Sequence, residues 1–417
     1  MTELSSQSSQ RPGFAKFVIG ELRPRGPVLT PFNIISGTLM LLAAVIIVIR
    51  FAYGLGSVTN LDQSFPWGLW ISFDVITGVA FAGGAYVLTF MVYILGMEKY
   101  HPIVRVTVLN GFLAYCFYAG ALVLDLGKPW NIINPIIGNE FGLSSVLFLV
   151  SWHFLLYIVS MAVEFSPAVA EWIGARRLRR ILSAMTVGAV IFGVTLSTLH
   201  QSALGALFLM AKTKIHPLWY SEFIPILFFV SSIFAGLSMV IFEGSISTRV
   251  FQHKLTSEIR FSHHSIVTGL AKICAAVMFV YLFVELIKLI DGQLLGHITG
   301  GWGSWYLVEI LGFTAVPMIL FMIGSQQGRI RMIQVASLLT MVGVVLNRLN
   351  ISIIAFRPNA PVHYYPTWME IVVSLGVIAA EIWVFRWIVN RMPVLSESPT
   401  WAYTRSSAEP SAQDAVA

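Results

Sequence analysis

Residues 65–78 read FPWGLWISFDVITG and open an apolar stretch that runs to Leu95. The stretch is long enough to cross a bilayer, which requires about 20 consecutive apolar residues in a helix. It nevertheless carries a carboxylate, Asp74. An ionisable side chain in hydrocarbon costs roughly 3 kcal/mol on insertion scales, so such residues usually face a bundle interior and mark an ion, proton or substrate path. Asp74 is therefore the first candidate functional residue.

The composition indicates a membrane protein. Of the 417 residues, 57% are hydrophobic and only 11% are charged, whereas about 25% of residues are charged in soluble domains. This balance excludes a soluble enzyme or binding domain and predicts an all-α polytopic membrane protein. Ten transmembrane helices are predicted, at about 34–56, 67–95, 103–124, 143–163, 181–203, 222–243, 267–290, 304–323, 332–355 and 368–389.

Basic residues are distributed unevenly between alternate connections. The N-terminal tail and the connections after spans four, six and eight are rich in Lys and Arg. The connections between spans one and two and between spans seven and eight have none. Because cytoplasmic connections carry the excess of basic residues, both termini are predicted to be cytoplasmic. The net charge of +6 is thus explained by orientation, without a nucleic-acid partner.

Three regions are predicted along the chain. Residues 1–32 form a cytoplasmic tail, residues 33–392 form the transmembrane domain, and residues 393–417, rich in Ser, Ala and Pro, form a disordered cytoplasmic tail. The two cysteines, Cys116 and Cys274, fall inside predicted spans. No thiol cluster is present to hold zinc or iron–sulfur, so any such cluster must come from another subunit.

Four polar residues are predicted near the outer, non-cytoplasmic ends of spans. Asp74 should lie about 10 Å inside that face by helical rise. His200 and Gln201 end span five near the same face, and Asp125 closes span three there. Together they offer hydrogen-bond donors and acceptors to a ligand carbonyl. The alternative is structural: hydrogen bonds between helices and, for Asp125, a solvated helix end.

Further polar residues lead toward the inner face. Tyr115 is near the middle of span three, Arg105 is at its inner end, and Glu243 is at the inner end of span six. These positions predict a polar route toward the cytoplasm. In the structural alternative, Arg105 extends to the headgroups and Glu243 is merely interfacial.

Charged residues in the last four spans predict ion pairs. Glu285 and Lys288 are three residues apart on one face of span seven, which allows them to pair. The remaining charged residues of this set are interpreted mainly as structural inter-helical ion pairs: Glu309, Arg348, Glu370, Glu381 and Arg386.

Spans two and six share the sequence FAG, at 81–83 and 234–236. Small residues let two helices approach closely. The spacing from neighbouring Trp residues differs between the two spans, so the repeat is only a hint of two related bundles.

Haem between two histidines is a common cofactor of membrane electron-transfer subunits. By helical rise, His153 is predicted about 15 Å and His200 about 5 Å from the outer face. The remaining histidines fall in connections or at interfaces. Because the two depths do not match, no haem is predicted, and no metal site either.

Several motifs occur in the same order in a known family. They are FAYGLGSVTNL at 51–61, FPWGLWISFD at 65–74, YHPIVR at 100–105, HQS at 200–202, HPLW at 216–219, IFEGS at 241–245 and YPTW at 365–368. The chain resembles the NrfD, or polysulfide-reductase membrane-subunit, family, and within it the ten-helix integral subunit of hydrogenase-2-type NiFe hydrogenases. The resemblance covers roughly residues 32–392.

The resemblance implies a haem-free quinone-binding subunit of a bacterial inner membrane, with two four-helix bundles and two extra helices. It further implies that a ferredoxin-like iron–sulfur subunit and a catalytic subunit dock on the outer face and exchange electrons with menaquinone or ubiquinone. Carried over by position, Asp74, Tyr115 and His200 belong to the quinone and proton site. Arg105 and Glu243 belong to an inner proton path.

One position departs from this pattern. The hydrogenase branch usually has Glu where this chain has Leu149, and His153, one turn further on, is the nearest substitute. Without the carboxylate, quinone turnover is expected to take its protons from the outer side and to generate little membrane potential. If His153 substitutes, replacing it should slow turnover more than replacing Leu149.

Other functions remain open at this point. The partner could instead be a molybdenum enzyme or a multihaem cytochrome complex. A secondary transporter would place its site near the midplane, between broken helices and inverted repeats, whereas here the candidate polar centre lies off the midplane and no convincing inverted repeat is seen. A non-enzymatic anchor with a degenerate quinone site is a further alternative. Subunits that copurify with the chain would discriminate between these.

Overall fold

The computed structural model describes residues 14–138, 142 and 145–396. Ten helical segments in these ranges are long and apolar enough to cross a membrane, which confirms the predicted all-α polytopic class. The spans are Pro31–Tyr53, Trp70–Ile94, Glu98–Asp125, Val146–Ile173, Arg176–Ala211, Ile224–Val250, Ile259–Asp291, Gly301–Gln327, Ile330–Ile354 and Trp368–Val389.

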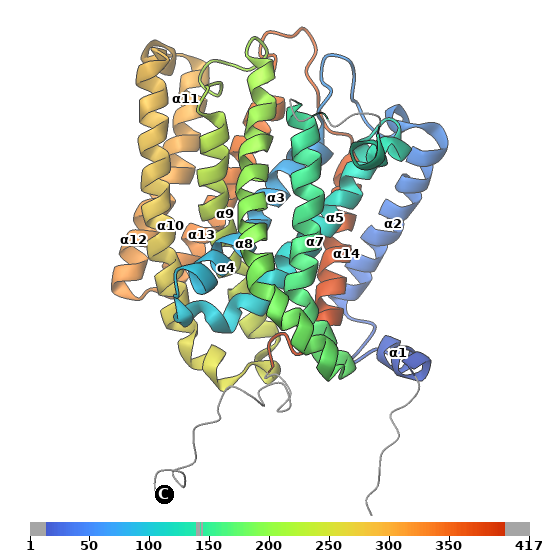
Figure 1. The fold of residues 1–417 in the computed structure, drawn as a ribbon. Helices are drawn as coiled ribbons and strands as arrows, with labels where there is room; N and C mark the ends of the chain where they lie inside the picture. The colour runs from blue at the N-terminus through green and yellow to red at the C-terminus, as the bar shows by residue number, and fades with distance from the viewer. Residues whose placement is uncertain (1–13, 139–141, 143–144, 397–417) are drawn as a thin grey trace, which may run out of the picture.

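Spans two to five form a first four-helix bundle, called bundle one. Its helices contact one another in sequence, and α7 and α8 form an extended antiparallel pair (Figure 1). Its elements are η2 (Trp70–Thr77), α3 (Gly78–Ala82), α4 (Gly84–Thr89), η3 (Phe90–Ile94), η4 (Glu98–Ile103), α5 (Val104–Asp125), α7 (Val146–Ile173), α8 (Arg176–Leu207) and η6 (Phe208–Ala211).

Spans six to nine form bundle two. Here α9 packs on α10 and α13, and α12 packs on α10 and α13. Its elements are α9 (Ile224–Val250), α10 (Ser257–Asp291), α11 (Gly301–Leu307), η9 (Val308–Ala315), α12 (Val316–Gln327), α13 (Ile330–Leu349) and η10 (Asn350–Ile354).

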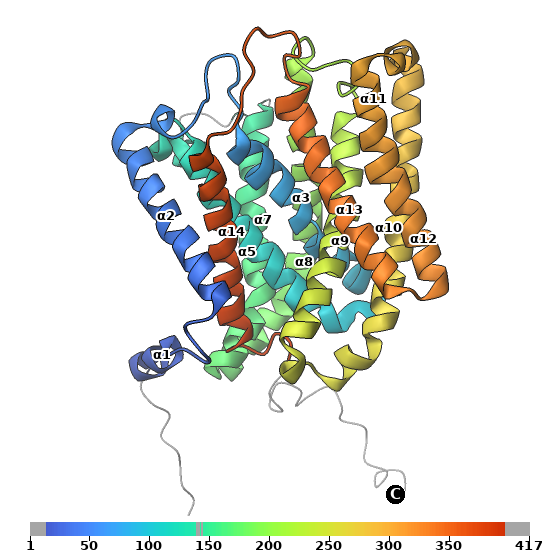
Figure 2. The ribbon, with the colours of Figure 1, turned by 180° about the vertical axis from the view of Figure 1, so that it is seen from behind.

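The first and last spans, α2 (Pro31–Tyr53) and α14 (Trp368–Val389), pair with each other, and α14 leans on α5 of bundle one. Figure 2 shows this pair standing beside the two bundles. The predicted plan of two four-helix bundles with two extra helices is the arrangement that these contacts give. The short elements between spans are η1 (Leu55–Ser57), η5 (Pro129–Ile133), α6 (Asn134–Ile137), η7 (Gln252–Lys254) and η8 (Leu294–Thr299).

Both ends of the described chain lie on one face of the molecule, here called the terminal face (Figure 1). The opposite face is the distal face. The short helix α1 (Phe14–Leu22) lies on the terminal face, where the Nε of Arg391 donates to the carbonyl of Glu21 at 2.5 Å. Val394 and Leu395 are buried there, so residues 393–396 pack against the body although they were assigned to the tail. Residues 397–417 lie outside the described ranges.

The two bundles meet where span two crosses α9. A Cβ atom placed on Gly236 would lie 2.0 Å from the Gly84 nitrogen, and one placed on Gly84 would lie 2.7 Å from the Gly236 carbonyl oxygen. Only glycine fits this crossing, as the shared FAG sequence predicted. Span two is also the most deeply buried of the ten spans, so it forms the axis of the molecule.

Span two is not a regular α-helix. Trp70–Thr77 and Phe90–Ile94 are wound as π-helix, and the helix breaks at Gly83. Such wide turns are rare and occur often at functional sites. In the first of them, the hydroxyl of Thr77 donates to the carbonyl of Ser72, five residues earlier, at 2.8 Å. Asp74 lies inside this wide turn.

Candidate functional site

Asp74 is buried where span two meets α14, with 1% of its surface exposed. Its Oδ2 accepts a hydrogen bond from the Ser374 hydroxyl at 2.7 Å. Its Oδ1 has no hydrogen-bond partner, and neither does the buried hydroxyl of Ser72, two residues earlier in the same span. A carboxyl group with a free oxygen therefore remains in the protein interior. Such a group is costly unless a ligand or a proton satisfies it.

Two further carboxyl groups, those of Asp125 and Glu370, lie on the distal side of Asp74, together with Arg50. Arg50 donates from Nε to the Leu124 carbonyl at 2.7 Å, capping the end of α5 as a cation does favourably. The Oδ1 of Asp125 has no partner, although its charge and that of Arg50 interact. We call Ser72, Asp74, Asp125, Arg50, Glu370 and Ser374 the distal cluster.

Glu370 ties the distal cluster to the last connection of the chain. With Thr367 it forms a capping box at the start of α14, and it accepts a hydrogen bond from the Tyr364 hydroxyl. Burial and the adjacent Glu370 both raise the pKa of Tyr364. Tyr364 therefore stays a neutral donor, and both oxygens of Glu370 are occupied.

A second polar cluster lies deeper in bundle one. The hydroxyl of Tyr115 on α5 lies 3.3 Å from Nδ1 of His200 on α8, so the structure joins this predicted pair. His200 has no exposed surface, and its Nε2 has no partner. The rings of Phe154 and Tyr157 pack on this pair, with Phe154 centred 5.3 Å from His200 and Tyr157 4.7 Å from Tyr115.

Ser197 and Gln201 complete this deep cluster. Ser197 lies beside the hydroxyls of Tyr115 and Tyr157, yet its Oγ makes no hydrogen bond of good geometry. The side-chain amide of Gln201 donates to the backbone carbonyl of Val79 at 2.9 Å. Gln201 therefore holds α8 against span two, which is the structural alternative considered for it.

Asp74 and His200 belong to different clusters, and no hydrogen bond between the described residues joins the two. Tyr118 lies three residues after Tyr115 on α5, and its ring covers Gly78, where an added Cβ would lie 2.3 Å from the ring. It is also within electrostatic range of Asp74. The predicted site residues thus lie in two polar clusters.

The two histidines inside spans lie at similar depths, so the predicted mismatch is wrong. Span five was predicted to end at residue 203, but α8 runs to Leu207, seven residues beyond His200, or about 10 Å by helical rise. His153 lies seven residues after the start of α7 at Val146, again about 10 Å. The two imidazoles interact electrostatically. The absence of haem therefore remains a prediction, but it is no longer supported by a difference in depth between His153 and His200.

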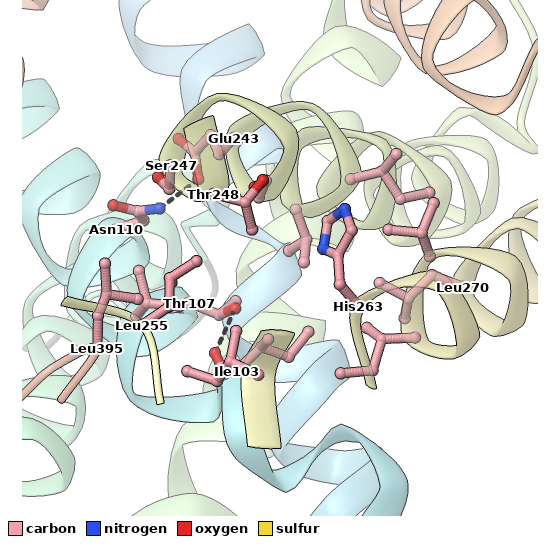
Figure 3. A pocket seen from close by; sticks show the side chains of 17 residues that line it. Ile103, Thr107, Asn110, Glu243, Ser247, Thr248, Leu255, His263, Leu270 and Leu395 are labelled. Atoms are coloured by element: carbon pink, nitrogen blue, oxygen red, sulfur yellow. Dashed lines mark hydrogen bonds between the residues drawn. The ribbon is translucent and has the colours of Figure 1, made fainter. Parts of the chain in front are cut away.

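The inner polar residues line two separate cavities. Figure 3 shows Glu243 accepting a hydrogen bond from the Asn110 amide in a cavity of about 40 Å³ that His263 also lines. Arg105 instead lines a cavity of about 400 Å³ and donates to Glu171 at 2.7 and 3.0 Å. The predicted single inner route is therefore divided in two.

A family model described as "Polysulphide reductase, NrfD" matches residues 57–356. The chain belongs to the polysulphide reductase, NrfD family. A protein of Nitratidesulfovibrio vulgaris is 42% identical over 376 residues, 90% of this chain and 97% of the relative. The probable Ni/Fe-hydrogenase 2 b-type cytochrome subunit of Escherichia coli is 32% identical over 371 residues, 89% and 94% of the two chains. The menaquinone reductase integral membrane subunit of N. vulgaris is 26% identical over 381 residues, 83% and 87%.

Sequence reasoning missed two buried carboxylates of this NrfD-family chain. Glu171 has a side chain with 0% exposure and pairs with Arg105 and Arg179. Glu164 lines the larger cavity, and its Oε1 has no partner. Span four was predicted to end at residue 163, which placed both outside the membrane, but α7 continues to Ile173. The signal that selected Asp74, a carboxylate in an apolar helix, also applies to Glu164.

Two carboxylates of bundle two, Glu285 and Glu309, are held by partners in the bundle or in the connection that leads into it. Glu285 and Lys288 form the predicted pair at 2.5 Å, and the Tyr306 hydroxyl donates to Glu285 at 2.6 Å. Glu309 accepts from three neutral donors at 2.5–2.7 Å: Trp219, Asn347 and Asn350.

Among the described residues, the other predicted inter-helical ion pairs do not form. Arg348 donates to Ser231 at 2.6 Å, and Arg386 donates to Asn33 at 2.9 Å. These two guanidinium groups donate hydrogen bonds to neutral partners because charged residues are rare in the spans, whereas hydroxyl and amide groups are available there.

No group of three or more His, Cys, Asp or Glu residues in the part of the NrfD-family chain that the structure describes could hold a metal ion.

Proposed function

We propose that this chain is the quinone-reacting membrane subunit of a respiratory oxidoreductase complex in a bacterial inner membrane. In this proposal a ferredoxin-like iron–sulfur subunit docks on the distal face, which is periplasmic, and both termini are cytoplasmic. Electrons pass between that subunit and menaquinone or ubiquinone. The chain holds no redox cofactor of its own. The hydrogenase relative, 32% identical along 89% of this chain, supports a NiFe hydrogenase as the catalytic partner.

The observation that carries the proposal is the free carboxyl oxygen of Asp74, buried near the distal face. An unsatisfied buried polar group costs roughly 1–3 kcal/mol. A quinone carbonyl oxygen accepts hydrogen bonds, and a protonated Asp74 can donate one. Asp74 thus matches the polar end of a quinone, while the surrounding span is apolar.

Quinone reduction takes up two electrons and two protons, so the site also needs groups that hold and pass protons. Asp74 can deliver a proton from Oδ1 to the carbonyl oxygen that it contacts. Asp125, toward the distal face, can reload it. On the deeper side, Nε2 of His200 is free, and Nδ1 is fixed by Tyr115. This pair can supply the second proton. Because the proposed quinone site is near the distal face, an iron–sulfur cluster docked on that face would be close enough to exchange electrons with the quinone.

The inner residues are proposed as a second proton route. His153 adjoins His200, Glu243 is bonded to Asn110, and Arg105 is bonded to Glu171 on the way to the terminal face. Whether this route carries protons decides whether quinone chemistry is coupled to charge transfer across the membrane.

The experiment compares Asp74→Asn with Asp291→Asn in the intact complex. Asp291 is an exposed carboxylate at the distal end of α10, so it controls for general loss of negative charge. We expect Asp74→Asn to assemble normally and to lower quinone-linked turnover at least about tenfold, a bound below the roughly 100-fold that is the low end for a lost general acid or base. Activity of the partner with an artificial dye should not change. Normal quinone turnover in Asp74→Asn would remove Asp74 from the site.

A second candidate keeps the same role with a different partner. The menaquinone reductase relative favours a non-hydrogenase complex, such as a molybdenum enzyme or a multihaem cytochrome complex. Subunits that copurify after mild detergent extraction decide between them. A hydrogenase large subunit with a ferredoxin-like protein supports the first, and several c-type haems support the second.

A further inference from the structure

The cavity of about 400 Å³ lies at the terminal face, away from both clusters. The ends of spans two and three, the helices α7 and α8, and the segment 393–396 form its walls. None of the residues of the distal or deep cluster lines it. The cavity is therefore distinct from both clusters, and of the residues in its wall only Arg105 has a role in the proposed function, in the inner proton route.

The wall of this cavity carries an excess positive charge. Arg105 and Arg179 both bind Glu171, at 2.7 and 3.2 Å, so two guanidinium groups face one carboxylate. Arg179 uses only Nε in this contact, and its side chain is 26% exposed. Its two Nη groups remain to donate hydrogen bonds into the cavity. A guanidinium in this state is well suited to bind a phosphate oxygen.

The depth of these groups corresponds to a lipid headgroup. The helix α8 has 32 residues, about 48 Å by helical rise, whereas the hydrocarbon core is about 30 Å thick. Its first turns, which include Arg179, therefore extend into the headgroup layer. Arg105 lies one residue after the start of α5 at the same face.

Deeper in the cavity, the wall changes from cationic to neutral and apolar. Glu164 lies seven residues before Glu171 on α7, about 10 Å further into the membrane. Its Oε1 has no partner, and a protonated carboxyl is a hydrogen-bond donor. Ser183, also in the wall, offers a hydroxyl. Phe165 continues the wall as an apolar surface.

The cavity is open toward the side of the molecule. Val187 lines it on α8, in a span most of which is not buried in the protein, and is itself 51% exposed; Tyr93, at the terminal-face end of span two, is 36% exposed. A free phosphate ion would need neither this lateral opening nor the apolar wall. A phospholipid needs both, because its acyl chains must stay in the bilayer.

We propose that this cavity binds one anionic phospholipid. The phosphodiester meets Arg179 and Arg105, the ester oxygens lie beside Glu164 and Ser183, and the first acyl carbons lie against Phe165. Two guanidinium groups share one carboxylate, so this end of the cavity is cationic and suits the negative charge of a phosphodiester. Basic pockets between helices on one side of a membrane bind anionic headgroups in this manner.

The test is native mass spectrometry of the full chain in its complex, titrated with phosphatidylglycerol, with phosphatidylcholine of the same acyl chains, and with inorganic phosphate. We expect one phosphatidylglycerol to be retained about fivefold more tightly than phosphatidylcholine, the effect of one additional basic contact. Arg179→Gln should abolish this preference. Arg180→Gln, an exposed neighbour that does not line the cavity, should keep it.

A second variant tests the cavity without removing charge. Ser183→Phe fills the space beside Glu164, and we expect it to lose the retained phosphatidylglycerol while thermal unfolding of the complex is unchanged. Equal retention of both lipids by the unmodified chain would overturn the proposal, as would equal losses in Arg179→Gln and Arg180→Gln. Displacement of the lipid by inorganic phosphate would assign the site to a free anion instead.

Discussion

Bundles one and two have the same number of helices and both contain buried charged residues, but they satisfy them differently. In the described part of the chain, eight buried side-chain polar atoms have no hydrogen-bond partner. Seven of them are on spans two to five: Ser72, Asp74, Asp125, His153, Glu164, Ser197 and His200. Only one, Nε of Arg348, is on spans six to nine.

In bundle two the buried carboxylates Glu285 and Glu309 are neutralised or surrounded by donors. Glu285 has Lys288 and Tyr306, and Glu309 has three neutral donors. Glu243 on α9 instead bonds to Asn110 of bundle one. Buried polar groups of this kind fix the packing of helices. The free atoms of bundle one do not stabilise the fold, since an unmade buried hydrogen bond costs free energy. We infer that bundle one carries the chemistry and that bundle two supports it.

The largest effect is expected at His200. His200→Leu removes the free Nε2 and the partner of Tyr115, so we expect quinone-linked turnover to fall about 100-fold, the low end for loss of general acid–base catalysis. Dye-linked activity of the catalytic partner reports assembly in the same preparation. Unchanged turnover per assembled complex would show that the deep cluster is structural, and would contradict the inference that bundle one carries the chemistry.

The matching change in bundle two is Glu285→Ala. It leaves Lys288 buried without its carboxylate, which should destabilise the protein by about 3–5 kcal/mol and lower the yield of folded complex. Turnover per folded complex should not change. The double variant Glu285→Met with Lys288→Met removes both charges and should recover most of the stability. A double variant as unstable as Glu285→Ala would show that Glu285 and Lys288 contribute to stability beyond neutralising each other's charge.

Only small effects on turnover are expected when His153 or Leu149 is replaced. Because protons are proposed to enter from the distal face, neither His153→Leu nor Leu149→Ala should change the membrane potential, and both should slow turnover only slightly. Proteoliposomes of the whole complex with a potential-sensitive dye give the measurement. An uncoupler-sensitive potential that His153→Leu abolishes, with assembly intact, would establish His153 as a relay in place of the usual Glu.

No effect at all is expected in the visible spectrum. His200 has Tyr115 at one nitrogen and Phe154 against its ring, so we expect the purified chain to show no b-type haem band on reduction. A stoichiometric band retained by this subunit alone would place haem between the two histidines, whose depths do match.

The fold was largely predictable from the sequence because each span is long and strongly apolar. The basic connections also follow a simple alternation. The ends of the spans were less predictable, since apolarity fades gradually where helices project into the headgroup layer. This error moved Glu164 and Glu171 out of the membrane and His200 toward its surface.

The site was predictable only in part. Asp74 was evident from its apolar surroundings, whereas Tyr115 and His200 were grouped only through the family resemblance, because their predicted depths differ. The position of Asp74 facing α14 depends on the π-helical turn at Trp70–Thr77, which has no clear sequence signal. The same applies to Ser374, an ordinary serine whose role depends on which helix it faces.

The most direct test of the account measures two quantities on two variants. Asp74→Asn and Glu309→Gln each remove a buried carboxylate without changing its size, one in bundle one and one in bundle two. Quinone turnover per folded complex and the midpoint of thermal unfolding are measured for both. We predict that Asp74→Asn loses turnover at least about tenfold with its unfolding midpoint unchanged, and that Glu309→Gln unfolds at lower temperature with its turnover unchanged. The reverse pattern would contradict the assignment of chemistry to bundle one and support to bundle two.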